Sequence, residues 1–168
     1  VAGQCISMAK AILPAKLLLR NIYRLLAQRQ SWESMLTLDN PSRQDLKWWA
    51  QALMEWNGRS ITTRPVDMQV ETDASGSGWG AHMVHNSKMA AGYWDNQMSL
   101  APSNTRELMA VIMAVLTFKD EMRHKKVQIL TDNITTAAYI SHLGGPSREL
   151  STMARNLWTL CYNNKIEL

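Results

Sequence analysis

The chain has 168 residues, of which 46% are hydrophobic and 19% charged, with only 8 Gly and 5 Pro. This length suits one modest domain with an additional segment, and the composition excludes collagen-like, low-complexity and disordered chains. The longest apolar stretch, AILPAKLLL, is interrupted by Pro and Lys well short of the roughly 20 residues that span a membrane, so no membrane partner is expected.

The first residues and the two cysteines bear on the origin and location of the chain. Residues 1–10 lack an initiator Met and the features of a secretory signal, so we expect a fragment of a longer protein. Cys5 and Cys161 have no partner at metal-ligand spacing, which indicates reduced thiols and an intracellular location, in the cytoplasm or nucleus.

The net charge of +4 is unevenly distributed along the chain. The first 65 residues carry nine Lys and Arg against four Asp and Glu, whereas the remaining residues carry nine against ten. This asymmetry favours a basic segment that contacts a polyanion, followed by a domain whose acidic residues have a separate role. A basic helix face exposed to solvent explains the same charges.

Helical periodicity dominates the first part of the chain. Apolar residues recur at helical spacing from Met8 to Gln30, interleaved with Lys and Arg, which predicts a basic amphipathic helix bent or started near Pro14. A second helix is expected after Asp39, ending near Trp56 at an Asn-Gly pair.

An alternating pattern begins after a polar connector, so we divide the chain into a helical segment, residues 1–62, and a domain, residues 63–168. Strands are expected over residues 66–73, 79–85 and 88–94. The turn residues between them predict an antiparallel meander.

The rest of the domain alternates helices with short strands. A helix is expected over residues 103–122, opened by Ser103 and Asn104 as capping residues, and is followed by a strand over residues 127–131. The complete order is β-β-β-α-β-α-α-β, an α/β fold. Its remaining members are helices over residues 133–143 and 148–163 and a last strand that starts at residue 165.

Three acids lie at the ends of expected elements. Asp73 ends the first strand, Glu107 lies in the first turns of the long helix, and Asp132 follows the fourth strand. Since strand ends in α/β sheets line the crevice where such folds keep their sites, the hypothesis is that the three side chains converge. Taken singly, each acid also suits a turn, a helix N-terminus or a helix cap, a role worth about 1 kcal/mol.

Convergence would have a chemical consequence. Three carboxylates within a few ångströms of one another repel unless cations lie between them. Mg²⁺, which binds through few carboxylates plus substrate phosphate, removes that conflict, and Mn²⁺ can substitute for it. Two such ions about 3.5–4 Å apart clamp the attacking and leaving oxygens of a phosphodiester displacement. A nuclease or polymerase therefore fits these acids better than a structural metal site.

Three segments resemble the motifs of a known family. VETDASGSGWGA at 70–81, SNTRELMAVIMAV at 103–115 and QILTDNITTAAYI at 128–140 resemble, in order and spacing, the first three motifs of type 1 ribonuclease H domains, particularly those that follow reverse transcriptases. The resemblance covers about residues 66–168. It implies a mixed five-stranded sheet, three antiparallel strands and then two parallel ones, with flanking helices.

The resemblance also implies an activity and assigns roles. It implies metal-dependent endonucleolytic cleavage of the RNA strand of RNA–DNA hybrids. Asp73 would bridge two metal ions, and Glu107 with Asp132 would complete the ion beside the leaving oxygen. Groups that contact sugars across the minor groove of the hybrid would come from Ala74, Ser75, Gly76 and Asn104.

Two further expectations follow from the same family. GQCISMAKAILPAKLLLRNIYRLL and DLKWWAQALMEWNGRSI resemble the segment that joins polymerase to ribonuclease H in DIRS-type retroelements, which have a tyrosine recombinase. Residues 1–62 would then be the tail of a reverse transcriptase, with their basic surplus along the template–primer duplex. The family's fourth carboxylate follows the fifth strand, so we expect a chain truncated before it, with weak or absent turnover. Asn133 is expected to cap the next helix.

Two other functions remain open at this point. An integrase-like nuclease has this fold and uses Asp, Asp and Glu with about 35 residues between the last two, as Asp132 and Glu167 are spaced here. However, Glu167 is expected on a strand rather than a helix, and Glu107 would have no role. A non-catalytic nucleic-acid-binding or connection module of the same fold is the second alternative, and the presence of all three acids argues against it.

Overall fold

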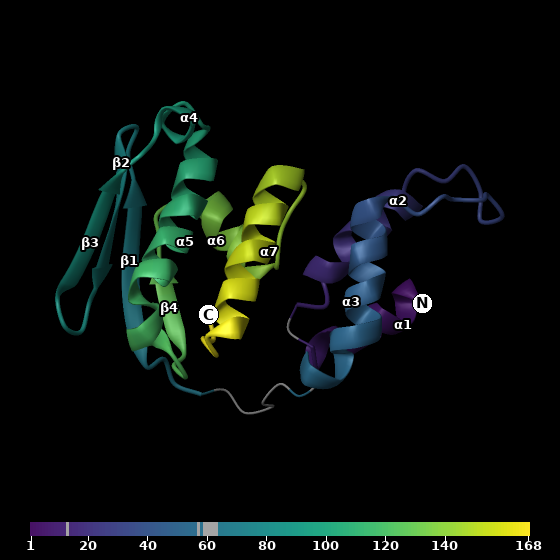
Figure 1. Cartoon of the computed structure of the whole chain (residues 1–168), viewed down its shortest axis with the longest axis horizontal. Helices are drawn as coiled ribbons and strands as arrows, with labels where there is room; N and C mark the ends of the chain where they lie inside the picture. Colours follow the sequence, from purple (N-terminus) through teal and green to yellow (C-terminus); the bar gives the residue numbers. More distant parts are fainter. Residues whose placement is uncertain (13, 57, 59–63) are drawn as a thin grey trace. The chain divides into compact units, whose positions relative to one another are not determined.

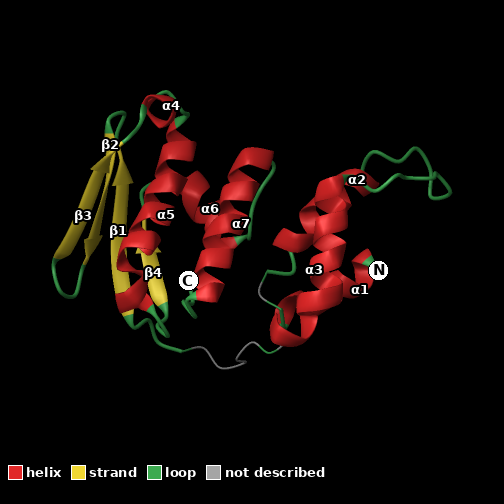
Figure 2. Ribbon diagram, in the orientation of Figure 1, coloured by secondary structure: helices red, strands yellow, loops and turns green. Residues whose placement is uncertain are grey.

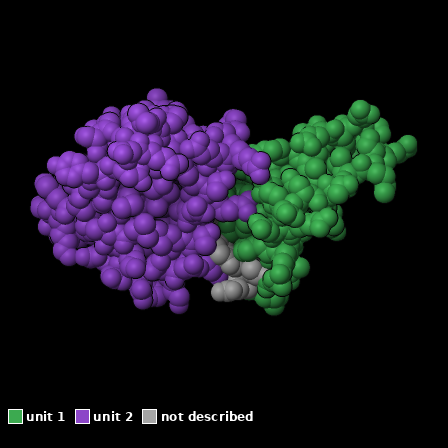
Figure 3. Space-filling model, turned by 45° about the horizontal axis from the view of Figure 1, so that its top comes forward, with its two compact units in different colours: residues 1–62 green, residues 63–168 purple. Residues whose placement is uncertain are grey.

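The chain forms two compact units, residues 1–62 and 63–168, in a computed structural model (Figure 3). Within the described part of the chain, the first unit is helical and the strands lie in the second unit (Figure 2). No helix among these residues combines the length and apolarity needed to cross a membrane. The structure describes residues 1–12, 14–56, 58 and 64–168.

The first unit begins with a series of short helices instead of the single amphipathic helix that was expected. A helix cannot run through Pro14, because proline lacks an N–H donor and restricts the residue before it. The prediction of one helix from Met8 to Gln30, bent or started near Pro14, is wrong, because separate short helices lie before and after Pro14. The observed helices are α1 (Ala2–Ser7), η1 (Met8–Lys10), η2 (Leu17–Leu19) and α2 (Arg20–Leu26), where η marks a 3₁₀ helix (Figure 1).

The second expected helix is confirmed as α3, Asn40–Trp56. Its start is stabilised by the side chain of Asp39, whose Oδ1 accepts a hydrogen bond from the backbone N–H of Ser42 at 2.8 Å. The expected stop signal includes Asn57, which lies outside the described residues. Trp49 of α3 is buried and donates its indole N–H to the carbonyl of Leu18 at 3.2 Å. The core of this unit comprises Cys5, Ile12, Ala15, Leu19, Ile22 and Trp49.

The second unit is built on a four-stranded mixed sheet in the order β3-β2-β1-β4. Neighbouring strands in the meander β1-β2-β3 are antiparallel, as predicted, and β4 pairs with β1 in parallel. The predicted mixed α/β architecture with flanking helices is therefore confirmed. The strands are β1 (Met68–Ala74), β2 (Gly78–Met83), β3 (Lys88–Tyr93) and β4 (Val127–Leu130).

The expected fifth strand corresponds to a single parallel bridge between Lys126 and Glu167. Val127 N–H donates to the Glu167 carbonyl at 2.7 Å, and Glu167 N–H donates to the Lys125 carbonyl at 3.0 Å. The Lys165 carbonyl accepts from His124 N–H at 3.0 Å, but Lys165 forms no ladder pair, because it still belongs to the turn after the last helix, with φ of 54° and its N–H bonded to a carbonyl of that helix. The described sheet thus has four strands, not five.

Three helices lie on one face of the sheet (Figure 1). They are α5 (Ser103–Met122), α6 (Ile134–Ser141) and α7 (Arg148–Asn163), and the bounds of α5 and α7 are those predicted from their apolar stripes. α5 contacts β1 and β2. Since side chains alternate along a strand, every second residue of β1 is buried beneath this layer. The buried residues of β1 are Met68, Val70 and Thr72.

Two features at the start of α5 differ from the prediction. The N-cap is Pro102, which makes no side-chain cap, so the capping roles expected for Ser103 and Asn104 are wrong. Proline can end an extended segment at a helix start because its missing N–H would be unsatisfied there anyway. A short helix that was not predicted, α4 (Asn96–Ser99), precedes it and is capped by Asp95, whose Oδ1 accepts from Met98 N–H at 2.7 Å.

Candidate metal centre

Asp73, Glu107 and Asp132 come together in the folded chain. One carboxylate oxygen of each lies within 4.8 Å of the other two. Parallel pairing of β1 with β4 explains the meeting of the two aspartates, because the register that pairs Glu71 with Leu130 brings Asp73 level with Asp132 when it is continued by two residues. Both strands end at the same edge of the sheet, and α5 supplies the third acid.

Glu107 is the buried member of the cluster. The residue is only 6% exposed, whereas Asp73 and Asp132 are exposed. Its Oε2 atom is buried and makes no hydrogen bond among the described residues. A buried carboxylate oxygen without a donor costs about 1–3 kcal/mol or more, since charged groups lose more solvation than neutral ones. A cation at this position would satisfy that oxygen.

Burial raises the pKa of Glu107, and the nearby charges of Asp73 and Asp132 raise it further. The backbone N–H of Ala74 and the charge of Arg106 oppose this effect. The Arg106 side chain is bonded elsewhere, because its Nη1 donates to the carbonyls of Ser99 and Ala101 at 3.0 and 3.1 Å. The cluster therefore concentrates negative charge that its own surroundings do not neutralise.

These donors fit a hard divalent cation. The group offers only carboxylate oxygens, which suit Mg²⁺ or Mn²⁺, and it contains no thiolate or imidazole that would favour a softer metal. The unsatisfied Oε2 of Glu107 is an independent sign of fit. Asp73, Glu107 and Asp132 are the residues that would hold such an ion.

The turn after β1 lies beside the cluster. Ala74 N–H donates to Oδ1 of Asp73 at 2.8 Å, which orients that carboxylate. The Ser75 hydroxyl accepts hydrogen bonds from Ser77 N–H at 3.2 Å and Gly78 N–H at 3.1 Å, so it closes the turn. Gly76 is the open position, because a Cβ atom there would meet nothing within 4 Å.

Asn104 and Asn133 form a link that the sequence analysis missed. Asn104 lies in the first turn of α5, and its Oδ1 accepts a hydrogen bond from Nδ2 of Asn133 at 3.0 Å. Asn133 also caps α6, as predicted, because its Oδ1 accepts from Thr136 N–H at 2.8 Å. No local pattern signals a side-chain contact between residues 29 positions apart.

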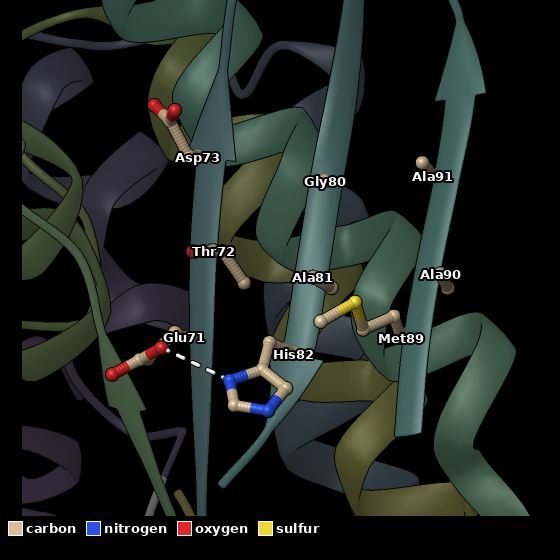
Figure 4. A pocket seen from close by; sticks show the side chains of 9 residues that line it. All are labelled: Glu71, Thr72, Asp73, Gly80, Ala81, His82, Met89, Ala90 and Ala91. Atoms are coloured by element: carbon tan, nitrogen blue, oxygen red, sulfur yellow. Dashed lines mark hydrogen bonds and ion pairs between the residues drawn. The ribbon is translucent and has the colours of Figure 1, made fainter. Parts of the chain in front are cut away.

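A hollow on the sheet is lined by residues of β1, β2 and β3 that include Asp73, whereas Glu107 and Asp132 of the metal centre do not line it (Figure 4). Figure 4 shows the Asp73 carboxylate directed away from Gly80 and Ala91, the small residues of the hollow. Glu71 and His82 pair across it, with Oε2 and Nδ1 3.1 Å apart. His82 therefore has a carboxylate partner.

The acids of an integrase-like centre are not brought together in the described chain. Glu167 pairs with the residue before β4, whereas Asp132 follows the end of that strand. Lys126, the partner of Glu167, and Asp132 are six residues of extended chain apart, a distance of roughly 20 Å. Glu107 takes the third place beside the two aspartates instead.

A meander continued by a parallel strand, with helices on one face and carboxylates at the shared strand edge, fits a ribonuclease H-like fold. Residues 64–160 match the family described as "RNase H-like domain found in reverse transcriptase". This match covers more than half of the chain, which therefore belongs to that family.

The chain was also compared with individual proteins. It is similar to a solved structure described as foamy viral protease-reverse transcriptase in complex with dsDNA, with 12% sequence identity and a TM-score of 0.43. The similarity covers 87% of this chain and 31% of that one. No curated protein matches the chain.

Proposed function

We propose that residues 63–168 hydrolyse the RNA strand of RNA–DNA hybrids as the ribonuclease H domain of a reverse transcriptase. The observation that carries this proposal is the convergence of Asp73, Glu107 and Asp132 within 4.8 Å of one another. Membership of the family of RNase H-like domains found in reverse transcriptase supports the choice of substrate class. Mg²⁺ is the proposed cofactor, as two ions, and Mn²⁺ would substitute.

Each acid has a distinct proposed task. Two bound ions would supply charge neutralisation at the scissile phosphate and activation of water. Asp73, which is exposed and held by the Ala74 N–H, would contribute to both ions. Buried Glu107 and exposed Asp132 would share the ion on the leaving-group side. In each case the bound ion would neutralise negative charge that the cluster by itself leaves uncompensated.

Substrate contacts are proposed for the segments beside the cluster. The backbone around Ala74, Ser75 and Gly76, together with the Asn104 side chain, would contact sugars across the minor groove of the hybrid. The 2′-hydroxyl of RNA offers a donor and an acceptor there that DNA lacks. Gly76 is open to solvent and leaves room for such an approach.

Residues 1–62 are proposed to be the tail of a polymerase from a DIRS-type retroelement. Their basic surplus would lie along the template–primer duplex, where Lys and Arg neutralise phosphates. The proposed partners are thus the RNA–DNA hybrid and the upstream reverse transcriptase domain. The arrangement of motifs in the sequence and the family of residues 64–160 support this context.

Cleavage of a labelled RNA–DNA hybrid tests the proposal. With excess protein and Mn²⁺, we expect the RNA strand of the hybrid to be cut and a DNA duplex of the same sequence to remain intact. Asp73→Asn should reduce the rate by at least about a hundredfold, since it removes a metal ligand. Glu71→Gln is the matched control on the same strand and should cleave normally. Equal cleavage by the parent chain and Asp73→Asn would refute the catalytic assignment.

A further inference from the structure

The Asn133 side chain has an orientation that its hydrogen bonds determine. The backbone N–H of Thr136 can only donate, so the atom of Asn133 that faces it at 2.8 Å must be the oxygen, Oδ1. The opposite end of the same planar amide is therefore Nδ2. This end faces Asn104 at 3.0 Å. A helix cap thus decides which group Asn133 presents to α5.

The consequence passes to Asn104. Because Asn133 presents a donor, Asn104 must turn its Oδ1 toward it, and the Nδ2 group of Asn104 lies at the other end of its amide. Asn104 is exposed, so this NH₂ group is available to solvent. Without Asn133, the Asn104 amide could present either its oxygen or its nitrogen.

The link joins the two segments that carry acids into the centre. Asn104 lies three residues before Glu107, on the same face of α5, and Asn133 follows Asp132 directly. Nucleic acid approaching this edge presents the N3 and O2 acceptors of the bases in its minor groove and the 2′-hydroxyls of ribose, which both accept and donate. A side-chain oxygen would repel the base acceptors, whereas an NH₂ group bonds to them and to the 2′-hydroxyl oxygen.

We propose that Asn133 is a positioning residue that holds Asn104 as a hydrogen-bond donor to the hybrid. This inference rests on the proposed function, because it names the device that prepares the substrate contact of Asn104. Asn133 does not itself touch substrate in this scheme. Its amide oxygen accepts from the α6 backbone, so its NH₂ group faces Asn104, and this determines which end of the Asn104 amide faces the substrate.

The test separates the cap from the link. Asn133→Ser retains a good helix cap, but its shorter side chain does not extend to Asn104, so the thermal unfolding midpoint of the domain should stay close to that of the parent. Affinity is measured by fluorescence anisotropy on the 168-residue chain, with an RNA–DNA hybrid and a DNA duplex of the same sequence, without divalent ions. We expect Asn133→Ser to bind the hybrid roughly three- to tenfold more weakly, the range that one hydrogen bond supplies. Binding to the DNA duplex should weaken less, because DNA lacks the 2′-hydroxyl that accepts from the same group.

A double-mutant cycle with Asn104→Ala identifies the route of the effect. In the Asn104→Ala background, Asn133→Ser should cause no further loss of hybrid affinity, because the group that it positions is gone. An equal loss in both backgrounds, or no loss in the parent background, would overturn the inference. Failure of the proposed function has a different signature, in which the parent chain binds the hybrid no better than the DNA duplex. Asn96→Ser is the control for an asparagine outside the link.

Discussion

A Cβ atom added to Gly92 would lie 2.6 Å from Nε1 of Trp79, the residue paired with it on β2. Trp79 is buried, so its indole ring cannot move aside freely. We expect Gly92→Ala to lower the free energy of unfolding by about 1–3 kcal/mol, the usual cost of overpacking. Urea denaturation measures this change. Gly80→Ala is the control, because a Cβ at Gly80 meets nothing within 4 Å, and similar losses in both variants would show that the indole is not the cause.

The raised pKa of Glu107 predicts how stability depends on pH. Between the ordinary value of 4.5 and the raised pKa, the folded state holds a proton on Glu107 that the unfolded state has lost. Stability should therefore fall as pH rises through this window and then level off. Glu107→Gln removes the ionisation, so we expect a flatter profile and higher stability at pH 8 in EDTA. Urea denaturation at several pH values measures the free energy of unfolding. The same pH profile in Glu107→Gln and the parent chain would show that Glu107 does not cause the pH dependence.

Divalent cations should reverse this instability. Mn²⁺ binds the folded cluster but not the dispersed acids, so saturating it to about 100 times Kd should add about 2.7 kcal/mol of stability. Thermal unfolding with Mn²⁺ and then with excess EDTA measures the gain and its reversal. Asp73→Asn and Asp132→Asn should lose most of the shift. Glu71→Gln should keep it, since Glu71 lies outside the cluster, and a shift of the same size in all variants would place the metal elsewhere.

Much of the fold could be predicted because single elements carry strong local patterns. α5 and α7 each have an apolar stripe long enough to define both ends, and the meander has turn residues between alternating strands. The acids could be singled out because they lie where strands end or a helix begins. The distance between their carboxylates could not be derived from the sequence, because it depends on the register between β1 and β4.

Other features depend on contacts that leave no local pattern. Pro14 predicted a bend or a new start in the first helix, but the division into several short helices depends on how these segments pack on Trp49. α4 has four residues, too few for a periodic signal. The link from Asn104 to Asn133 joins an exposed and a half-buried polar side chain, and composition and spacing do not distinguish such residues from solvated ones.

Cys161 should be chemically inert in the native protein. Burial raises its pKa to about 12, and a protonated thiol is a poor nucleophile. In a Cys5→Ser variant, which leaves one thiol, we expect no reaction with a disulfide reagent at pH 8 on the timescale on which the urea-unfolded chain reacts completely. Labelling should become rapid only in urea. Rapid labelling of the native variant would show that α7 opens without global unfolding.

The parallel pairing of β1 with β4 also constrains the order of folding. Gln69 and Gln128 bond across these strands at 2.8 Å although 59 positions separate them in sequence. Contacts between such distant segments carry a large loop-closure cost and form slowly. Asp73 and Asp132 meet only after this pairing, so a nascent or partly folded chain has no chelating cluster to offer. A cation that needs all the acids should therefore retard unfolding and leave the refolding rate unchanged, which makes ion capture a marker of completed folding.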